Sequence, residues 1–309
     1  MAQFSITEAA LTGFRVVRER PSAVLGWAAV YLVLLGASWV ALTSVAGPAI
    51  AEVQSHGLPS DPAAFRSFMQ QIGLAEPPML GLSLLSGAVF AAAMNRAVMT
   101  PDDKGLAYMK LGRDELAQLG LKLFLLLLSL SVNILAVGLA QGLAAVGGML
   151  GPGGAALAGL ADTAASVGAL IGLIYLNLRL SLASAASFDQ RRIDLRTSWR
   201  MTRGRVGEIL SAYALAFALT GLVLALGLVI VLLLTGALAA LIDPTNSIKP
   251  NLSTPYGLLA PLPLTTLCLM ALLFGLTAPL LSTPGAFIYQ RLAKADASPE
   301  PGRKSDFYA

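Results

Sequence analysis

Six long apolar stretches restrict this chain more than any other feature. They cover residues 22–46, 78–99, 118–146, 156–182, 207–241 and 260–290. Each is long enough to cross about 30 Å of bilayer hydrocarbon, because an α-helix rises about 1.5 Å per residue. A backbone in lipid must satisfy its own hydrogen bonds, which favours helices for such stretches. We therefore expect an all-α, polytopic membrane protein, with six transmembrane helices in a single domain over residues 1–294.

The composition agrees with a chain that lies mostly in lipid. Only 12% of the residues are charged, and the mean hydropathy is +0.73. A soluble domain has about 25% charged residues, so this chain has too little polar surface for a water-facing shell. The first apolar stretch exceeds the core of a cleaved signal peptide, about 7–15 residues, and is expected to stay as a helix. The polar residues 295–309 predict a disordered cytoplasmic tail.

The basic residues lie almost entirely on one side of the expected spans. Of the 21 Lys and Arg residues, all but two lie before the first span, after the last, or beside the connections that follow the second and fourth spans. Only Arg66 and Lys249 lie on the opposite side. The positive-inside rule therefore places both termini in the cytoplasm, with the protein in a bacterial inner membrane.

The connection over residues 47–77 carries its own helix signal. Asp61 is a good N-cap, and Pro62 suits the first helical position. Phe65, Met69 and Ile72 follow at helical spacing. The pattern predicts a short amphipathic helix on the outer surface.

A short pattern recurs before the first, third and fifth spans. A bulky apolar residue is followed by a basic residue and, three positions further on, by an arginine: Phe14, Arg15 and Arg18; Met109, Lys110 and Arg113; Trp199, Arg200 and Arg203. This recurrence predicts an internal repeat of three units, about 5–99, 100–186 and 189–291. Each unit would consist of a cytoplasmic amphipathic elbow helix followed by a transmembrane hairpin.

The expected elbow helices have partial start signals. Ser5 and Glu8 fit a capping box, and Thr100 with Asp103 fits its Asp variant, with Pro101 at the first helical position. The third unit lacks such a box. We expect these helices along the inner surface, with their apolar sides in lipid or against the bundle.

Five arginines of the elbows are candidate contacts for lipid headgroups. They are Arg15, Arg18, Arg113, Arg200 and Arg203. Their repeated position at the level of the lipid phosphates indicates a surface for membrane lipids, anionic phospholipid in particular. The alternative is that these cations only fix the topology.

The most distinctive stretch lies before the fifth span. In residues 195–205, Ser198, Trp199, Thr202 and Gly204 form a Ser-Trp-x-x-Thr-x-Gly pattern. This elbow resembles that of YciC-like bacterial inner-membrane proteins, and it is similar to the membrane domain fused to some glycerophosphodiester phosphodiesterases. The resemblance implies about six spans with cytoplasmic elbows. It implies no chemistry, because the phosphodiesterase activity belongs to a separate soluble domain.

Few polar groups fall within the spans. Asn133 and Gln141 are the deep uncharged polar residues of the third span, where they would either join helices by hydrogen bonds or line a path. Asp162 is expected near the outer interface. Arg96 and Arg179 are expected to extend to the inner surface.

Small residues recur every four positions in the fourth span, at Ala164, Gly168 and Gly172. Such a seam lets helices approach closely. It predicts packing within the bundle or, alternatively, between two copies, so the oligomeric state stays open.

The sequence lacks the usual signatures of an enzyme or a metalloprotein. The single histidine, His56, and the single cysteine, Cys268, have no partner of their kind. No nucleophilic triad, paired-carboxylate site or phosphate loop is recognisable, so we expect no catalytic residue, metal or cofactor. The basic residues flank the spans, so the net charge of +4 does not indicate a nucleic-acid partner.

These observations favour an integral inner-membrane protein that is not an enzyme and that organises lipid or a partner membrane protein. The alternative is a transporter or lipid flippase with a cavity between the repeats. That alternative predicts a cavity lined by Asn133, Gln141 and the sixth span. Prolines would break this span, at Pro261, Pro263, Pro279 and Pro284.

Overall fold

The computed structural model describes residues 4–102, 105–149, 151–242 and 251–297, and all regular elements in these ranges are helices. Six are long: α2 (Pro21–His56), α4 (Glu76–Met99), α5 (Arg113–Met149), α6 (Pro152–Arg179), α9 (Val206–Ile242) and α10 (Pro261–Ala297). By length and composition, six helices can cross a membrane. The prediction of an all-α chain with six membrane-spanning helices is confirmed to this extent.

Shorter elements connect the long helices. They are α1 (Ile6–Glu19), α3 (Pro62–Gly73), η1 (Leu106–Tyr108), α7 (Ala183–Gln190), α8 (Leu195–Met201) and η2 (Pro255–Leu259). The short helix predicted in this connection is present as α3, and its predicted cap is confirmed, because Asp61 Oδ2 accepts a hydrogen bond from the Ala64 N–H at 2.9 Å. The preceding helix, α2, runs ten residues past its predicted end because it continues through Pro48.

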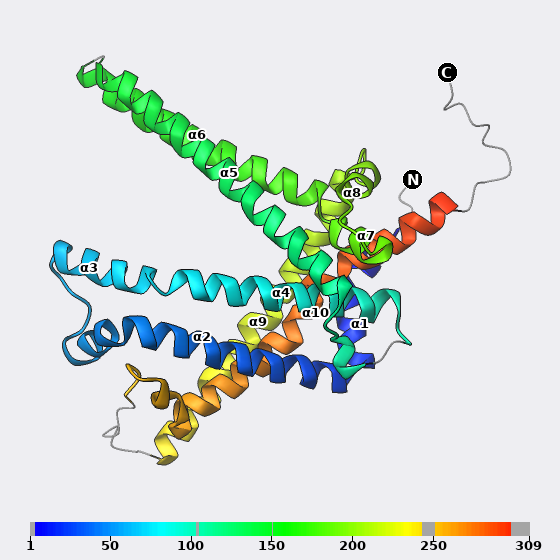
Figure 1. Ribbon diagram of the computed structural model, residues 1–309, viewed down its shortest axis with the longest axis horizontal. Coiled ribbons are helices and arrows are strands. Elements are labelled where there is room, and N and C mark those ends of the chain that lie inside the picture. The colour runs from blue at the N-terminus through cyan, green and yellow to red at the C-terminus, as the bar shows by residue number, and fades with distance from the viewer. Residues whose placement is uncertain (1–3, 103–104, 150, 243–250, 298–309) are drawn as a thin grey trace.

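Helix α10 is the centre of a bundle that we call the body. It packs against α1, α2, α4 and α9 (Figure 1). Helix α1 belongs to this bundle rather than to the surface alone, since Ala9, Ala10 and Val16 are buried. The approach is close at Gly13, where a Cβ atom would lie 2.4 Å from Leu280 Cα. The apolar side of the first elbow helix therefore lies against the bundle, one of the two positions expected for it.

Helices α5 and α6 form a hairpin that diverges from α2 and α4 (Figure 1). We call it the hairpin. A Cβ atom on Gly168 or Gly172 would meet nothing within 4 Å. The prediction that this small-residue seam packs within the bundle is therefore wrong for the described chain, because no atom of the body lies against these two glycines.

Among the described residues, the second unit does not form its predicted elbow helix. Pro101 lies in a turn, Asp103 lies outside the described residues, and only the one-turn helix η1 follows. Ala107 and Tyr108 have positive φ angles of 51° and 62°, which an α-helix cannot contain. The Trp27 indole Nε1 fixes this turn by donating to the Ala107 carbonyl at 2.8 Å. Tertiary contacts thus override the local helix signal.

Helix α10 is continuous from Pro261 to Ala297, so Pro279 and Pro284 do not break it. Both prolines are buried among the other helices of the body. Residues 295–297, assigned to the tail from sequence, are the last residues of α10. The other tail residues, 298–309, lie outside the described ranges.

Candidate functional site

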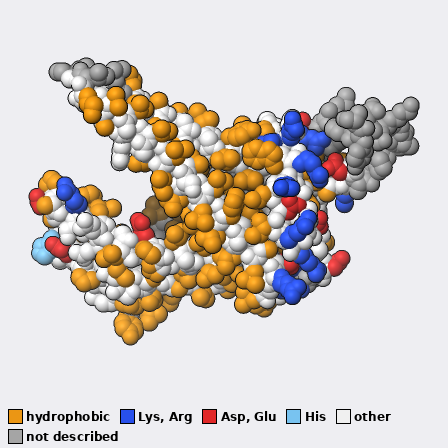
Figure 2. All heavy atoms as spheres, turned by 45° about the horizontal axis from the view of Figure 1, so that its top comes forward, with side chains coloured by type: hydrophobic (Ala, Val, Ile, Leu, Met, Phe, Trp, Pro, Cys, Tyr) orange, Lys and Arg blue, Asp and Glu red, His pale blue; other side chains and the backbone are white. Residues whose placement is uncertain are grey.

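Lys and Arg side chains gather at one end of the molecule. Figure 2 shows most of them at one end of the visible face, with one blue group at the opposite end, while the flanks are mainly hydrophobic. Helices α1, α7 and α8 and the last turns of α10 lie at this end (Figure 1). We call it the cation-rich end.

All five arginines predicted to contact lipid are exposed. They are Arg15, Arg18, Arg113, Arg200 and Arg203, and we call them the basic surface. Three elements bring them there: α1, the first residue of α5, and α8 with the turn after it. Among the described residues, none of the five guanidinium groups makes a hydrogen bond or an ion pair. Their charges are therefore open to solvent or to lipid phosphates.

Arg96, near the end of α4, is buried rather than at the surface. Its side chain is 3% exposed, and its Nη2 lies 2.9 Å from Glu115 Oε1 and 3.3 Å from Asp114 Oδ2. Its Nη1 donates to the Tyr108 carbonyl, and the guanidinium group lies over the Phe188 ring. The prediction that Arg96 extends to the surface is wrong, because two carboxylates at the start of α5 neutralise it inside the protein.

A chain of hydrogen bonds beside Arg96 joins three helices. Asn95 Nδ2 donates to Ser184 Oγ at 2.9 Å, and Ser184 Oγ donates to Gln118 Oε1 at 2.8 Å. Gln118 Nε2 donates in turn to the Ser184 carbonyl at 2.8 Å. Since Gln118 is fully buried, these bonds hold the start of α5 against α4 and α7. No sequence pattern indicated Ser184 or Gln118, because polarity beside an apolar stretch is their only signal.

Arg179, the last residue of α6, is also buried, so its predicted extension to the surface is wrong. Its Nη1 donates to Thr202 Oγ1 at 3.2 Å, and its guanidinium carbon lies 4.3 Å from the Trp199 ring centre. Its carbonyl accepts a hydrogen bond from Ser198 Oγ at 2.9 Å. Gly204 has a φ of +75°, which glycine adopts without steric cost. The Ser-Trp-x-x-Thr-x-Gly residues therefore fasten the end of α6 to the turn before α9.

The same elbow begins with a capped helix, α8. Asp194 Oδ1 accepts a hydrogen bond from the Thr197 N–H at 3.0 Å. Burial alone would raise the pKa of Asp194, but the hydrogen bonds from Thr197 and the charge of Arg192 together lower it. A single Asp cap thus starts this helix, where the sequence showed no capping box.

A pocket of about 420 Å³ lies among α4, α5, α7 and α10. We call it the polar pocket. Its charged lining residues are Arg96, Asp114, Asp189, Arg191 and Lys294. These residues come from distant parts of the chain, so no local sequence pattern could indicate the pocket.

Asn133 and Gln141 both lie exposed on α5 of the hairpin. Asn133 Nδ2 donates to the Ser129 carbonyl at 2.8 Å. Asn133 also lines a cavity of about 210 Å³ with Asp162, which is exposed, and with Ser166. All residues that line this cavity belong to α5 and α6. The structure thus places Asn133 opposite α6 and does not bring it to α10.

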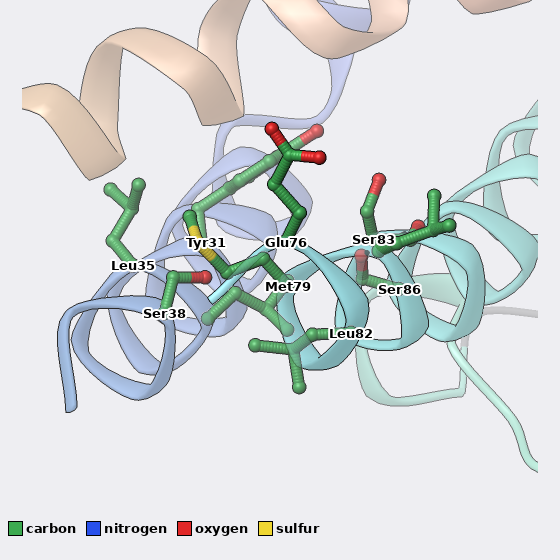
Figure 3. Close-up of a pocket in the computed structure, with 10 residues that line it drawn as sticks. Tyr31, Leu35, Ser38, Glu76, Met79, Leu82, Ser83 and Ser86 are labelled. Carbon is green, nitrogen blue, oxygen red and sulfur yellow. Dashed lines mark hydrogen bonds between the residues drawn. The ribbon is translucent and has the colours of Figure 1, made fainter. Parts of the chain in front are cut away.

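Figure 3 shows a groove of about 440 Å³ between α2 and α4. Tyr31 and Leu35 line it from α2, and Met79 and Leu82 line it from α4. The single carboxylate in its lining is Glu76, the first residue of α4. A mainly apolar groove of this kind suits an apolar chain.

Within the described ranges, no group of three or more His, Cys, Asp or Glu residues could hold a metal ion. No protein-family model, curated protein or solved structure matches this chain. The resemblance to YciC-like proteins therefore stays a hypothesis that rests on the elbow residues alone.

Proposed function

We propose that this is a bacterial inner-membrane protein that binds anionic lipid at the inner leaflet and organises lipid or a partner membrane protein, without catalysing a reaction. The observation that carries the proposal is the basic surface, with five exposed arginines unpaired in the described chain. Guanidinium groups bind phosphate through two parallel hydrogen bonds. Each cation near an anionic leaflet contributes about 1 kcal/mol of attraction.

The proposal includes an orientation, with the cation-rich end in the cytoplasm. Its support is the excess of Lys and Arg at this end, as the positive-inside rule requires. Helix α1 and the last turns of α10 lie there together (Figure 1), which favours two termini on one side. Reporter tags on both termini should be accessible only from the cytoplasm. A tag found outside the cell would contradict the orientation.

The proposal also includes the three repeated units. The order of elements supports it, since two long helices follow each of α1, η1 and α8 along the chain. The first and third units begin with a short α-helix, whereas the second begins with the one-turn helix η1. We infer that the second unit has exchanged its elbow helix for a turn held by the body.

Replacing Arg200 and Arg203 together by Gln tests the lipid role. We expect R200Q/R203Q to retain several-fold less anionic phospholipid after purification, because two attractions of about 1 kcal/mol are removed. Native mass spectrometry measures the retained lipid. The matched control is R66Q, which removes an exposed arginine on α3, away from the basic surface. Unchanged lipid in R200Q/R203Q, or an equal loss in R66Q, would contradict the proposal.

A transporter or lipid flippase is the second candidate, and one observation favours it. A groove of about 450 Å³ lies between α2 and α10, lined by Trp39 and Met270 among others. The buried indole Nε1 of Trp39 has no hydrogen-bond partner in the described chain. In a C268S background, a cysteine at Met270 should react with an impermeant maleimide if the groove is a water path. A cysteine at this position that does not react with the maleimide would argue against a water path through the groove.

A further inference from the structure

The polar pocket has a largely buried floor. Phe188 and Tyr289 are buried, with exposed fractions of 9% and 4%. Arg96 faces the pocket, but Asp114 and Glu115 already neutralise its charge. The one cation of the floor is therefore already paired within the protein.

The rim of the pocket carries charges that are not paired with one another. Asp189, Arg191 and Lys294 all line the pocket, and all three are exposed. The Tyr289 hydroxyl donates to Asp189 Oδ2 at 2.8 Å, which orients this carboxylate. Within the described residues, the side chains of Arg191 and Lys294 make no hydrogen bond or ion pair. The rim therefore offers two cations and one oriented carboxylate.

We propose that the polar pocket binds a small zwitterion that carries both a phosphate and an ammonium group, as in phosphoethanolamine or the headgroup of an aminophospholipid. The phosphate would pair with Lys294 and Arg191, and the ammonium group with Asp189. The inference rests on the proposed function in one respect, because a lipid can supply the headgroup only if the cation-rich end faces a leaflet.

The charges of the rim favour a zwitterion over an ion of one sign. A phosphate without an ammonium group would leave Asp189 unpaired beside it, and an isolated ammonium group would face Arg191 and Lys294. The volume of about 420 Å³ falls within the roughly 300–1,000 Å³ of small-molecule sites. Met99 and Ala293 add an apolar wall against which a glycerol carbon chain could lie.

Calorimetry on the purified full chain in detergent tests the proposal with two short-chain lipids, dihexanoyl phosphatidylethanolamine and dihexanoyl phosphatidylglycerol. Both carry the phosphate, and only the first carries the ammonium group. Because the anionic phosphatidylglycerol can also bind the basic surface, the quantity compared is the ratio of the two affinities. D189N should lower the affinity for phosphatidylethanolamine relative to that for phosphatidylglycerol about fivefold, the size of one partly exposed ion pair. K294Q should weaken both lipids, because it removes a phosphate contact.

The substitutions are chosen to leave the fold intact. In D189N, the side-chain amide oxygen can still accept the hydrogen bond from the Tyr289 hydroxyl, and Lys294 is exposed. R66Q, on α3, is the matched charge control and should bind both lipids like the wild type. A ratio of the two affinities that D189N leaves unchanged would overturn the proposal.

The same measurement with soluble phosphoethanolamine distinguishes a free metabolite from a lipid headgroup as the ligand. Binding comparable to that of the short-chain lipid indicates a free metabolite as the ligand, and binding only of the lipid indicates a headgroup. Binding of neither overturns the inference. If neither binds while R200Q/R203Q still loses anionic lipid, the inference fails and the proposed function stands.

Discussion

The body and the hairpin are held in different ways. In the apolar 18-residue segment of α10, 33% of the residues are buried. The corresponding segment is 6% buried in the span that contains α5, and none of it is buried in the span that contains α6. The body is held by close packing, as at Gly13 against Leu280. The hairpin is held at the cation-rich end, by the polar contacts of Glu115, Gln118 and Arg179 and by a small apolar cluster around Leu121. Polar substitutions should therefore affect the attachment of the hairpin, and steric ones the body.

The largest effect is expected from Glu115→Ala at the base of the hairpin. The change removes the closer carboxylate partner of Arg96 and leaves a buried guanidinium group with Asp114 alone. Breaking a buried ion pair typically costs about 3–5 kcal/mol. Thermal unfolding in detergent measures the loss, and hydrogen exchange should rise first in α5 and α6.

Glu208→Ala is the matched control for this variant. Glu208 is the third residue of α9, as Glu115 is of α5, and its Oε2 has no hydrogen-bond partner in the described chain. We expect a change below about 1 kcal/mol, the size of the interaction with the helix dipole. Equal losses in the two variants would show that the Arg96 contact does not hold the hairpin.

Gly13→Ala tests the packing of the body. The added Cβ would lie 2.4 Å from Leu280 Cα, so α1 must move away from α10. Overpacking of this kind costs about 1–3 kcal/mol, and the backbone contact places it near the upper value. Gly168→Ala in the hairpin is the control, and should be neutral or stabilise α6 by about 0.5–1 kcal/mol. A melting temperature that is lower for the hairpin variant would reverse the comparison.

Thr202→Val tests the elbow that returns the hairpin to the body. The change keeps the shape of a fully buried side chain but removes the oxygen that accepts from Arg179 Nη1. We expect a loss of about 1–2 kcal/mol, because a buried donor loses its partner. Thr163→Val in α6 removes the hydroxyl of an exposed threonine and should change stability by less than about 0.5 kcal/mol. Similar melting curves for both variants would argue against the structural role of the elbow pattern.

The smallest effect is expected from Asp194→Ala, which removes the cap of α8. We expect a loss of about 0.5–1 kcal/mol at pH 7. Because folding lowers the pKa of Asp194, its stabilisation is fully present above the ordinary value of 3.8 and is lost as the pH falls through the lowered value. The difference in melting temperature between wild type and D194A should therefore shrink below pH 3.8. A difference that does not depend on pH would exclude the carboxylate as its source.

Local signals predicted the elements whose causes are local. The Asp61 cap and the following proline predicted α3, and the apolar stretches predicted six long helices. The same kind of signal failed at Pro101, because Trp27, 80 residues from Ala107, holds that turn in a conformation that excludes a helix. The helix prediction failed where a side chain distant in sequence stabilises a conformation other than the one that the local residues favour.

The two buried arginines show the same limit for the candidate site. A lone arginine at the end of an apolar stretch is expected to reach the surface. Arg96 and Arg179 are instead paired with Glu115 and Thr202, which lie 19 and 23 residues further along the chain. The five exposed arginines of the basic surface also lie close to apolar stretches, so closeness to a span does not by itself distinguish burial from exposure.

The sequence by itself determined that the chain forms six membrane-length helices and that its cations lie at one set of helix ends. The hydropathy of a segment and the positions of its charges are local properties, and they do not depend on what the segment contacts in the folded protein. Only the tertiary structure decided that the hairpin diverges from the body, that two arginines are buried, and that Asp189 and Lys294 share one pocket. These features depend on contacts between residues far apart in the chain, because a charged side chain can be buried only where a group of opposite charge or a hydrogen-bond partner lies beside it.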